Sequence, residues 1–282
     1  MTPLELNTFE LNAVGLENVL VVKIGGALGD DMARCADDLA RLAAVRPLIV
    51  VHGVSAVMDA LCADRGLPVR TITSPTGHSS RYTDAATRDV FVEAAEQVNR
   101  SLVHALLDRG VHAVGLIGDQ VPLIGERKAA IRAIVDGRVR MVRDDYSGSI
   151  VGVNTDALRN ALHEGSVVVV PPMAASADGL LNVDGDRAGA AIAGAFGAHD
   201  YVILSGVRGL YRRFPDESSF IARIAHHEIE TALEWAQGRM KRKVIGAAEA
   251  LTAGVRRVVI ADGRAPHPVS AALNGAGTEF CA

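Results

Sequence analysis

Residues 19–26 read Val19-Leu20-Val21-Val22-Lys23-Ile24-Gly25-Gly26, and this stretch decides the fold. Its continuous apolar run predicts a short strand buried inside a parallel sheet. Ligands of open α/β sheets bind beyond the carboxyl ends of the strands. We therefore expect Lys23 to bring a cation to that edge, where Gly25 and Gly26 allow another group to approach the backbone closely. The alternative is a core strand followed by a lysine and an ordinary turn.

The segments that follow alternate between helix and strand. Apolar residues at helical spacing predict a helix over 30–45, and residues 48–51 (Leu-Ile-Val-Val) predict a second buried strand that ends at His52-Gly53. Another helix follows and ends near Gly66 and Pro68. Strands that alternate with helices, with glycines at the strand exits, are typical of a mainly parallel α/β sheet.

Further along the chain, turn residues predict a loop over 73–80, and Asp84 is expected to cap a long helix that runs to about Arg109. Alternating residues around Asp136-Gly137 predict a hairpin. The remaining predicted elements are strands at 111–117, 166–170, 201–204 and 256–261, and helices at 154–164, 187–196, 228–235 and from 238 to Gly254. The strand–helix rhythm restarts near residue 180. We therefore predict two lobes, 1–180 (with 1–18 as an extension) and 181–282.

Composition narrows the functional class. The net charge is −4 and the isoelectric point is near 6.1, which argues against nucleic acid as the main partner. The three cysteines, Cys35, Cys62 and Cys281, form no CxxC pair, so neither a disulfide framework nor a zinc site is indicated. Residues 1–18 contain no Lys or Arg, unlike a signal peptide, and the Val167–Val170 run is far too short to cross a membrane. We expect a cytoplasmic protein with no membrane partner.

Several catalytic motifs are absent from the sequence. It contains no Walker A motif, no GxGxxG after a strand, no GxSxG and no HExxH. What remains is a set of glycine-rich strand exits, two candidate lysines and one acid that is expected to be buried. Phosphoryl transfer depends mainly on positioning and on cations near the transferred oxygens. A carboxylate acceptor is already ionised near pH 7 and needs no general base, so these residues suit such an acceptor better than an alcohol.

Six motifs together carry a family resemblance. They are Lys23-Ile-Gly25-Gly26, His52-Gly53, Arg81-Tyr-Thr-Asp84, Asn182-Val-Asp-Gly-Asp186, Leu204-Ser-Gly-Val-Arg-Gly209 and Gly238-Arg-Met-Lys-Arg-Lys243. In this order they resemble the amino acid kinase family over roughly residues 19–280. Within it the chain is similar to acetylglutamate kinases, and more so to kinases that phosphorylate 2-aminoadipate or glutamate attached to an amino-group carrier protein. The second likeness rests on residues 73–84, Phe214-Pro-Asp-Glu-Ser-Ser and Gln237-Gly-Arg-Met-Lys-Arg-Lys-Val.

The resemblance implies an architecture and a reaction. The expected fold is a three-layer αβα sandwich with a mainly parallel central sheet, an N-terminal acceptor lobe, which usually forms a homodimer, and a C-terminal ATP lobe. The expected activity is ATP-dependent phosphorylation of a side-chain carboxylate to an acyl phosphate in lysine- or arginine-type biosynthesis, with ATP and Mg²⁺ and with no metal ligand assigned to the protein.

The resemblance also implies residue roles. Lys23 and Lys243 would stabilise the transition state from opposite sides of the phosphoryl group, and Asp186 would hold both lysines. Arg81 would bind the α-carboxylate end of the acceptor with two hydrogen bonds, as arginine prefers. The implied substrate-binding set is Gly26, Gly53, Val54, Arg81 and Asn182, with backbone N–H groups of Gly25, Gly26 and Gly53 facing phosphate and acceptor. The implied ATP-binding set is Lys23, Gly25, Ser205, Gly206, Gly209, Tyr211, Met240 and Lys243.

The predicted hairpin is strongly basic. Residues 126–143 contain six basic residues against Glu126 and Asp136 in an otherwise acidic chain. Such a patch suits an acidic partner. We expect His78, Arg138 and Arg140 to receive the acidic amino-group carrier; the alternative is a solvated hairpin face.

Two positions depart from the family pattern. Val54 stands where the family usually has a second glycine after the histidine, and residues 117–120 (Ile-Gly-Asp-Gln) replace a Gly-Leu-Ser-Gly run. Valine resists positive φ, so either the backbone at Val54 suits valine or the pocket is altered. Two alternatives stay open at this point. One is a kinase of free N-acetylglutamate, and the other is a non-catalytic ligand-binding member of the fold.

Overall fold

The computed structural model describes residues 18–27, 32–74, 79–135, 138–165 and 167–281. Its central sheet is built from β1 (Leu20–Ile24), β2 (Leu48–His52), β5 (Ala113–Gly115), β10 (Val167–Val170), β13 (Asp200–Ser205), β16 (Arg223–Ala225), β17 (Arg257–Asp262) and β18 (Thr278–Cys281). The strand order is β16-β18-β17-β13-β1-β2-β10-β5. The six strands from β17 to β5 run parallel, and β18 is antiparallel to β17.

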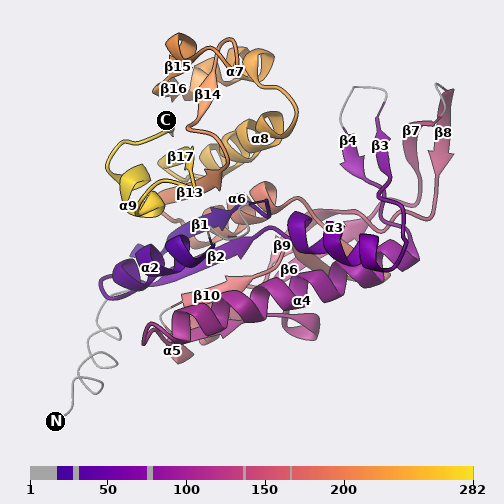
Figure 1. The fold of residues 1–282 in the computed structure, drawn as a ribbon, viewed down its shortest axis with the longest axis horizontal. Coiled ribbons are helices and arrows are strands. Elements are labelled where there is room, and N and C mark those ends of the chain that lie inside the picture. Colours follow the sequence, from indigo (N-terminus) through magenta and orange to yellow (C-terminus); the bar gives the residue numbers. More distant parts are fainter. Residues whose placement is uncertain (1–17, 28–31, 75–78, 136–137, 166, 282) are drawn as a thin grey trace.

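Helices cover both faces of this sheet (Figure 1). One face carries α2 (Met32–Ala43), α4 (Ala85–Leu107) and α9 (Pro268–Leu273), and the other carries α5 (Thr155–Glu164), α6 (Gly185–Phe196), α7 (Ile229–Trp235) and α8 (Arg239–Thr252). A further helix, α3 (Ser55–Asp64), follows β2 and packs against α4. The predicted three-layer αβα architecture with a mainly parallel sheet is confirmed.

Strand β1 lies in the middle of the sheet and is buried along its whole length. Leu20, Val22 and Ile24 pack into the core beneath α2, α4 and α9, whereas Val21 packs into the core beneath α6 and α8. Because side chains alternate along a strand, Lys23 lies on the same face as Val21. Lys23 is therefore directed toward α6, where a Cβ added to Gly185 would lie 3.3 Å from its Cε.

The loops that leave β1 and β2 pack backbone against backbone. A Cβ added to Gly53 would lie 2.3 Å from the Gly26 nitrogen, and one added to Gly26 would lie 2.5 Å from the Val54 nitrogen. The Gly53 N–H donates to Ile24 O (2.8 Å), and the Ala56 N–H donates to Gly26 O (3.0 Å). Glycine is needed at positions 26 and 53 because any side chain there would separate the two strand exits.

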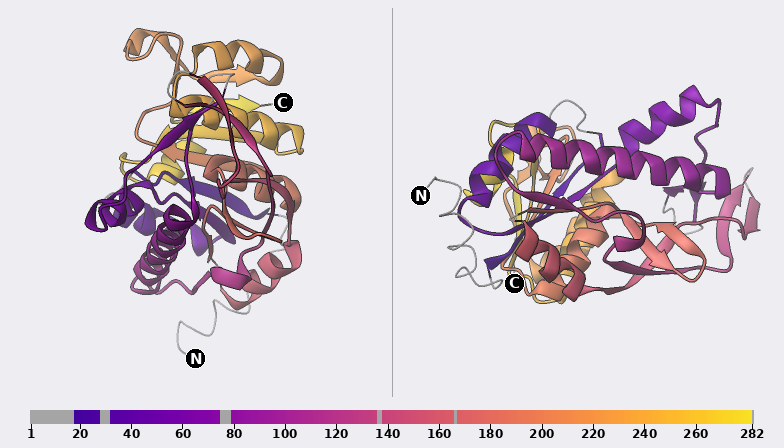
Figure 2. Two further views of the ribbon diagram at one scale, coloured as in Figure 1. Left: turned by 90° about the vertical axis from the view of Figure 1, so that its right-hand side faces the viewer. Right: turned by 90° about the horizontal axis from the view of Figure 1, so that it is seen from below.

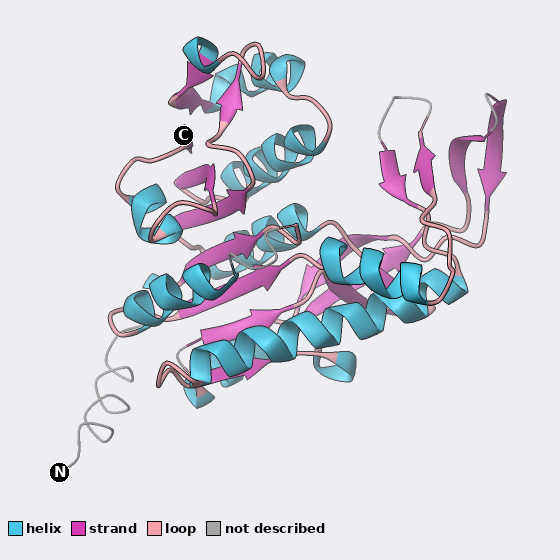
Figure 3. Ribbon diagram, viewed as in Figure 1, coloured by secondary structure: helices cyan, strands magenta, loops and turns pink. Residues whose placement is uncertain are grey.

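Three smaller sheets complete the described chain (Figure 3). One consists of β12 (Gly179–Asn182), β11 (Met173–Ser176), β6 (Leu123–Arg127) and β9 (Gly148–Val153), in that order. A second, here called the hairpin sheet, consists of β4 (Ser79–Arg81), β3 (Thr71–Thr73), β7 (Ile131–Val135) and β8 (Arg138–Val142). The third pairs β14 (Leu210–Tyr211) with β15 (Phe220–Ile221). The hairpin sheet projects from one end of the molecule, next to α3 (Figures 1 and 2).

Several local predictions can be compared with these elements. The hairpin is confirmed by the pairing of β7 with β8, although its turn at 136–137 lies outside the described residues. Asp84 caps α4 as predicted and accepts a hydrogen bond from the Thr87 N–H (2.9 Å). The loop over 73–80 was wrong in part, because Ser79 and Ser80 belong to β4, which pairs with β3. The extension at 1–17 lies outside the described residues.

No helix in the described ranges is both long enough and apolar enough to cross a membrane.

His52 ends β2 in a fully buried position. Its Nε2 lies 3.4 Å from the amide nitrogen of Asn99 in α4, and that nitrogen also donates to Val169 O (3.0 Å). Burial lowers the pKa of His52 from 6.5 to about 4, because the charged imidazolium loses its hydration. His52 is therefore neutral at pH 7 and joins the end of β2 to α4.

This lowered pKa predicts a pH-dependent stability. The unfolded chain takes up a proton on His52 below about pH 6.5 and the folded chain only near pH 4, so stability falls as the pH falls through this window. The full effect is about 3 kcal/mol. Chemical denaturation at several pH values should show a smaller loss between pH 6.5 and 4 in His52→Gln than in the parent chain. The exposed histidine of α4 gives the control His104→Gln, and an equal loss in His52→Gln and the parent would contradict this interpretation.

Candidate active site

Two lysines and one aspartate from distant parts of the sequence meet beside the carboxyl end of β1. Lys23 Nζ lies 2.7 Å from Asp186 Oδ1, and Lys243 Nζ lies 3.1 Å from Asp186 Oδ2. All three side chains are at most one tenth exposed. Asp186 was expected to hold both lysines, and the structure brings the three residues together with that pairing.

The position of Asp186 follows from the start of α6. Asp184 caps this helix and accepts hydrogen bonds from the N–H groups of Asp186 (2.9 Å) and Arg187 (3.1 Å). The Tyr201 hydroxyl of β13 donates to Asp186 O (2.8 Å). Since a Cβ on Gly246 would lie 3.0 Å from Asp186 O, the glycine lets α8 approach closely enough to bring Lys243 to the carboxylate. The positive end of the α6 dipole also favours a carboxylate here.

The electrostatics of this cluster are unbalanced. Burial alone would raise the pKa of Asp186, but the charges of Lys23 and Lys243 outweigh burial and lower it to about 2. Burial and the nearby Lys23 together lower the pKa of Lys243 to about 8. The ammonium groups of Lys23 and Lys243 thus both pair with the single carboxylate of Asp186, and all three groups are buried. An additional anion would compensate the excess positive charge, so the cluster is suited to bind phosphate oxygens.

The predicted acceptor residues Arg81 and Asn182 are linked through Thr83. The Asn182 side-chain amide donates to Thr83 Oγ1 (3.1 Å), and Thr83 Oγ1 donates to Arg81 O (3.3 Å). The buried carboxylate of Asp145 accepts the Thr83 N–H (2.7 Å). Sequence reasoning missed Thr83 and Asp145. Thr83 lies within the Arg81–Asp84 motif, which was a usable signal, whereas Asp145 had none.

The strand exits require one correction. The Gly53 N–H was expected to face phosphate or acceptor, but it donates to Ile24 O. The observed role of Gly53 is close packing against Gly26. Gly25 and Gly26 are half-buried.

The backbone at Val54 suits valine, which is the first of the two alternatives given for this position. Its φ is −126°, which valine adopts without strain, and its side chain is buried in an apolar cluster with Met58, Phe91 and Met173. The side chain therefore packs inside the protein.

Apart from Lys23 and Gly25, the predicted ATP residues come from the end of β13, from the segment after it and from the start of α8. Ser205 ends β13, next to β1, and its Oγ closes a turn with the backbone of Val207 (3.0 Å to O). Gly206 is exposed and has open space around it. Gly209 packs tightly on Thr278, where a Cβ would lie 2.4 Å from Oγ1.

Tyr211 and Met240 have mainly packing contacts. The Tyr211 ring meets Phe214 and Phe220 edge-on, and its hydroxyl donates to Glu217 (3.0 Å). Met240 lies half-buried against the core in the first turn of α8. Packing on Thr278 accounts for the glycine at position 209, and the ring contacts and the bond to Glu217 account for the tyrosine at position 211. None of these contacts assigns a ligand to either residue.

The predicted docking residues Arg138 and Arg140 lie on the hairpin sheet and are exposed. Residues paired across neighbouring strands share a face, so the pairs Arg81–Thr71, Thr73–Ile134 and Ile134–Val139 define one face of this sheet. Because side chains alternate along β8, Arg138 and Arg140 lie on the opposite face from Arg81. His78 lies outside the described residues.

Beyond Thr73, the face that carries Arg81 holds three partly exposed apolar side chains and the exposed Arg132. Ile134, Val139 and Met141 are 40%, 51% and 53% exposed. Arg132 lies on this face because it pairs with Met141, whereas Arg138 and Arg140 lie on the other face.

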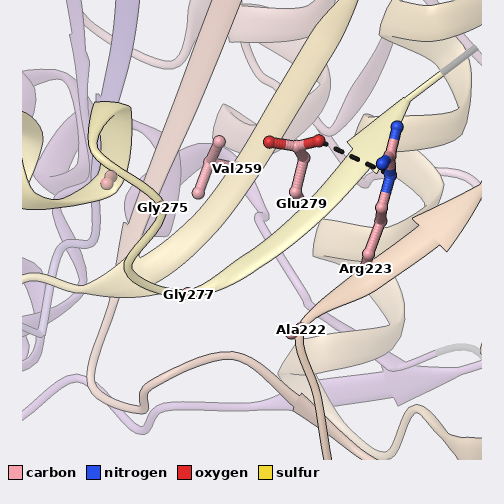
Figure 4. Close-up of a pocket in the computed structure, with 7 residues that line it drawn as sticks. Ala222, Arg223, Val259, Gly275, Gly277 and Glu279 are labelled. Carbon is pink, nitrogen blue, oxygen red and sulfur yellow. Dashed lines mark ion pairs between the residues drawn. The ribbon is translucent and has the colours of Figure 1, made fainter.

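A separate cavity of about 150 Å³ lies between β16, β17, α9 and β18 (Figure 4). It is lined in part by Glu279 and Arg223, whose carboxylate and guanidinium are 3.7 Å apart. None of the predicted site residues lines it. In the described part of the chain, no group of three or more His, Cys, Asp or Glu side chains could hold a metal ion.

Comparison with known proteins gives a consistent result. A protein of Deinococcus radiodurans named LysW-aminoadipate kinase is 43% identical over 272 residues, which are 95% of this chain and 93% of the relative. One of the same name from Thermus thermophilus is 41% identical over 267 residues, or 92% of this chain and 99% of the relative.

Solved structures share the architecture. The N-acetylglutamate synthase of Neisseria gonorrhoeae, solved with coenzyme A and N-acetyl-glutamate, superposes with a TM-score of 0.77 at 26% identity. That alignment covers 98% of this chain but only 63% of the synthase. Carbamate kinase of Giardia lamblia gives a TM-score of 0.65 at 15% identity, over 94% of this chain and 98% of the kinase, which shows the fold alone.

The model of the amino acid kinase family matches residues 18–262. This span contains β1, the Lys23–Asp186–Lys243 cluster and the hairpin sheet. The chain belongs to the amino acid kinase family.

Proposed function

We propose that the chain is a kinase that transfers the γ-phosphoryl group of ATP to a side-chain carboxylate. The acceptor is 2-aminoadipate or glutamate attached through its amino group to an acidic carrier protein, and the product is an acyl phosphate. The observation that carries the proposal is the buried Lys23–Asp186–Lys243 cluster. The names of the Deinococcus and Thermus relatives support the acceptor class.

The chemistry follows from the charges. A carboxylate oxygen of the acceptor attacks the γ-phosphorus, and the bond to the departing ADP oxygen breaks. No proton has to be removed from the acceptor, so the site needs cations and alignment but no base. Lys23 and Lys243 stabilise the charge on the transferred oxygens, while Asp186 keeps both ammonium groups in place.

The residues present fit ATP with Mg²⁺. The excess positive charge of the cluster and the open space at Gly206 suit a polyphosphate, with residues 205–211 and 240–243 nearest the nucleotide. The ATP phosphates would hold the magnesium ion, which would neutralise part of their charge. We assign acceptor binding to the N-terminal part (1–180), with Asn182 at its border, and ATP binding to 181–282.

The hairpin sheet is the proposed carrier-docking element. It projects beside α3, it carries Arg81 at one end of β4, and its described residues include Arg132, Arg138 and Arg140. A negatively charged carrier would be attracted by these arginines. Arg132 lies on the same face as Arg81, and the linked amino acid would reach the cluster along that face, while Arg138 and Arg140 attract the carrier from the opposite face.

The proposal is tested by ATP- and magnesium-dependent acyl phosphate formation, trapped with hydroxylamine. Carrier-linked aminoadipate, carrier-linked glutamate and free N-acetylglutamate should be offered side by side. We expect a signal with a carrier-linked acceptor. A signal with N-acetylglutamate alone would assign the free amino acid as acceptor, and ATP binding without turnover of any acceptor would favour a ligand-binding protein.

Removing either cation should abolish most of the turnover. We expect Lys23→Ala and Lys243→Ala each to lower kcat by about 10²- to 10³-fold, as loss of one stabilising group does in other enzymes. The fold should survive, because Asp186 keeps the other lysine as a partner. Single-turnover rates should be measured together with thermal unfolding, and a fully active Lys23→Ala enzyme would refute the assignment.

Reversing the hairpin charges should weaken carrier recognition selectively. In Arg138→Glu and Arg140→Glu we expect KM for the carrier-linked acceptor to rise about tenfold, more at low salt than at high salt, while KM for ATP stays unchanged. The control Arg256→Glu makes the same charge change at an exposed residue before β17. If both hairpin variants behave like this control, docking does not involve these arginines.

A further inference from the structure

The two terminal guanidinium nitrogens of Arg81 differ in their hydrogen bonding: Nη2 has a partner and Nη1 has none in the described chain. Its Nη2 lies 2.5 Å from Asp59 Oδ1, which comes from α3, whereas Arg81 itself ends β4. Its Nη1 is buried and has no hydrogen-bond partner in the described chain. Of the two terminal nitrogens of this guanidinium, only Nη1 is left to bind a further group.

The free nitrogen points to a ligand. A buried N–H group without a partner costs about 1–3 kcal/mol, and more when it is charged, so native proteins rarely keep one without a reason. Guanidinium N–H groups match carboxylate oxygens in geometry and charge. A ligand carboxylate at Nη1 would remove the cost. Asn182 lies near the Arg81 backbone, because Thr83 Oγ1 accepts from the Asn182 amide and donates to Arg81 O.

Asp59 is well placed to fix the arginine. It lies near the middle of α3, which begins directly after the Gly53-Val54 strand exit, so its contact ties Arg81 to that exit. A free arginine side chain has about 2 kcal/mol of rotamer entropy to lose on binding. Holding Nη2 in advance lowers that cost for the ligand. Because Asp59 is about half exposed, solvent screens its charge and it does not cancel the attraction of Arg81 for an anion.

We propose that Asp59 is a positioning residue for the acceptor, which fixes the Arg81 guanidinium through Nη2 so that Nη1 can bind the acceptor's α-carboxylate end. This inference rests on the proposed function for the identity of the acceptor. It adds a residue that none of the motifs contains, and it assigns that residue a role in acceptor binding and none in the chemical step.

The test separates acceptor binding from turnover. In Asp59→Ala we expect KM for the acceptor to rise about tenfold, with kcat and KM for ATP within twofold of the parent. Asp59→Asn should recover most of the affinity, because its amide oxygen still accepts from Nη2. Asp64→Ala, at the end of the same helix, is the matched control and should behave like the parent. In an Arg81→Ala background, Asp59→Ala should have no further effect.

Other outcomes would overturn the inference. An unchanged acceptor KM in Asp59→Ala would make the contact an ordinary surface ion pair, which is usually worth little. Parallel losses for acceptor and ATP, or no recovery in Asp59→Asn, would indicate a structural role.

A calorimetric titration keeps this inference distinct from the proposed function. Carrier-linked aminoadipate and N-acetylglutamate are titrated into the parent and into Asp59→Ala without turnover. If no acceptor is phosphorylated but Asp59→Ala weakens binding, the proposed function fails and the positioning role stands. If the parent binds neither compound, both fail.

Discussion

The buried carboxylate of Asp186 is the group on which the site depends. Taking one carboxylate and two ammonium groups out of water costs several kcal/mol per ion, and pairing recovers this only with good geometry. The structure provides that geometry by placing a strand end, a helix N-terminus and a second helix around one point. Because two cations meet one anion, the cluster stays positively charged. A site built this way is incomplete without an anionic ligand, which is the physical link between the fold and phosphoryl transfer.

Small residues make this convergence possible. Gly246 lets α8 approach the backbone of Asp186, Gly189 makes room for the Tyr201 ring, and Gly185 leaves space for the Lys23 side chain. The chain contains 49% hydrophobic but only 4% aromatic residues, so its layers pack through Ala, Val, Leu and Gly. Around the Lys23–Asp186–Lys243 cluster, glycines allow the helices to approach closely, so the charged side chains can meet without large side chains between them.

The acceptor side is built differently. Arg81 and Asn182 are held by hydrogen bonds through Thr83 and Asp145, and Arg81 is held by Asp59 from a separate helix. The face of the hairpin sheet that carries Arg81 also carries partly exposed apolar residues and Arg132, and Arg138 and Arg140 lie on its other face. A buried cationic cluster inside the sandwich and a sheet that projects from one end of the molecule suit the proposed acceptor, which arrives on a macromolecule.

The sequence by itself determined the alternation of strands and helices, the buried strand at Lys23 and the family motifs, because hydrophobic periodicity, turn residues and cap residues act over a few positions. The family motifs also pointed to Lys23, Asp186 and Lys243. Only the tertiary structure decided that Gly53 packs against Gly26, that Val54 turns into the core, that β4 pairs with β3 and that Arg138 lies opposite Arg81. The contacts of Asp59, Thr83 and Asp145 were likewise decided by the tertiary structure. Most of these facts depend on contacts between segments far apart in the sequence, and the others depend on strand pairing and register, in which a shift of one residue moves a side chain to the other face. Local sequence patterns carry no information on either.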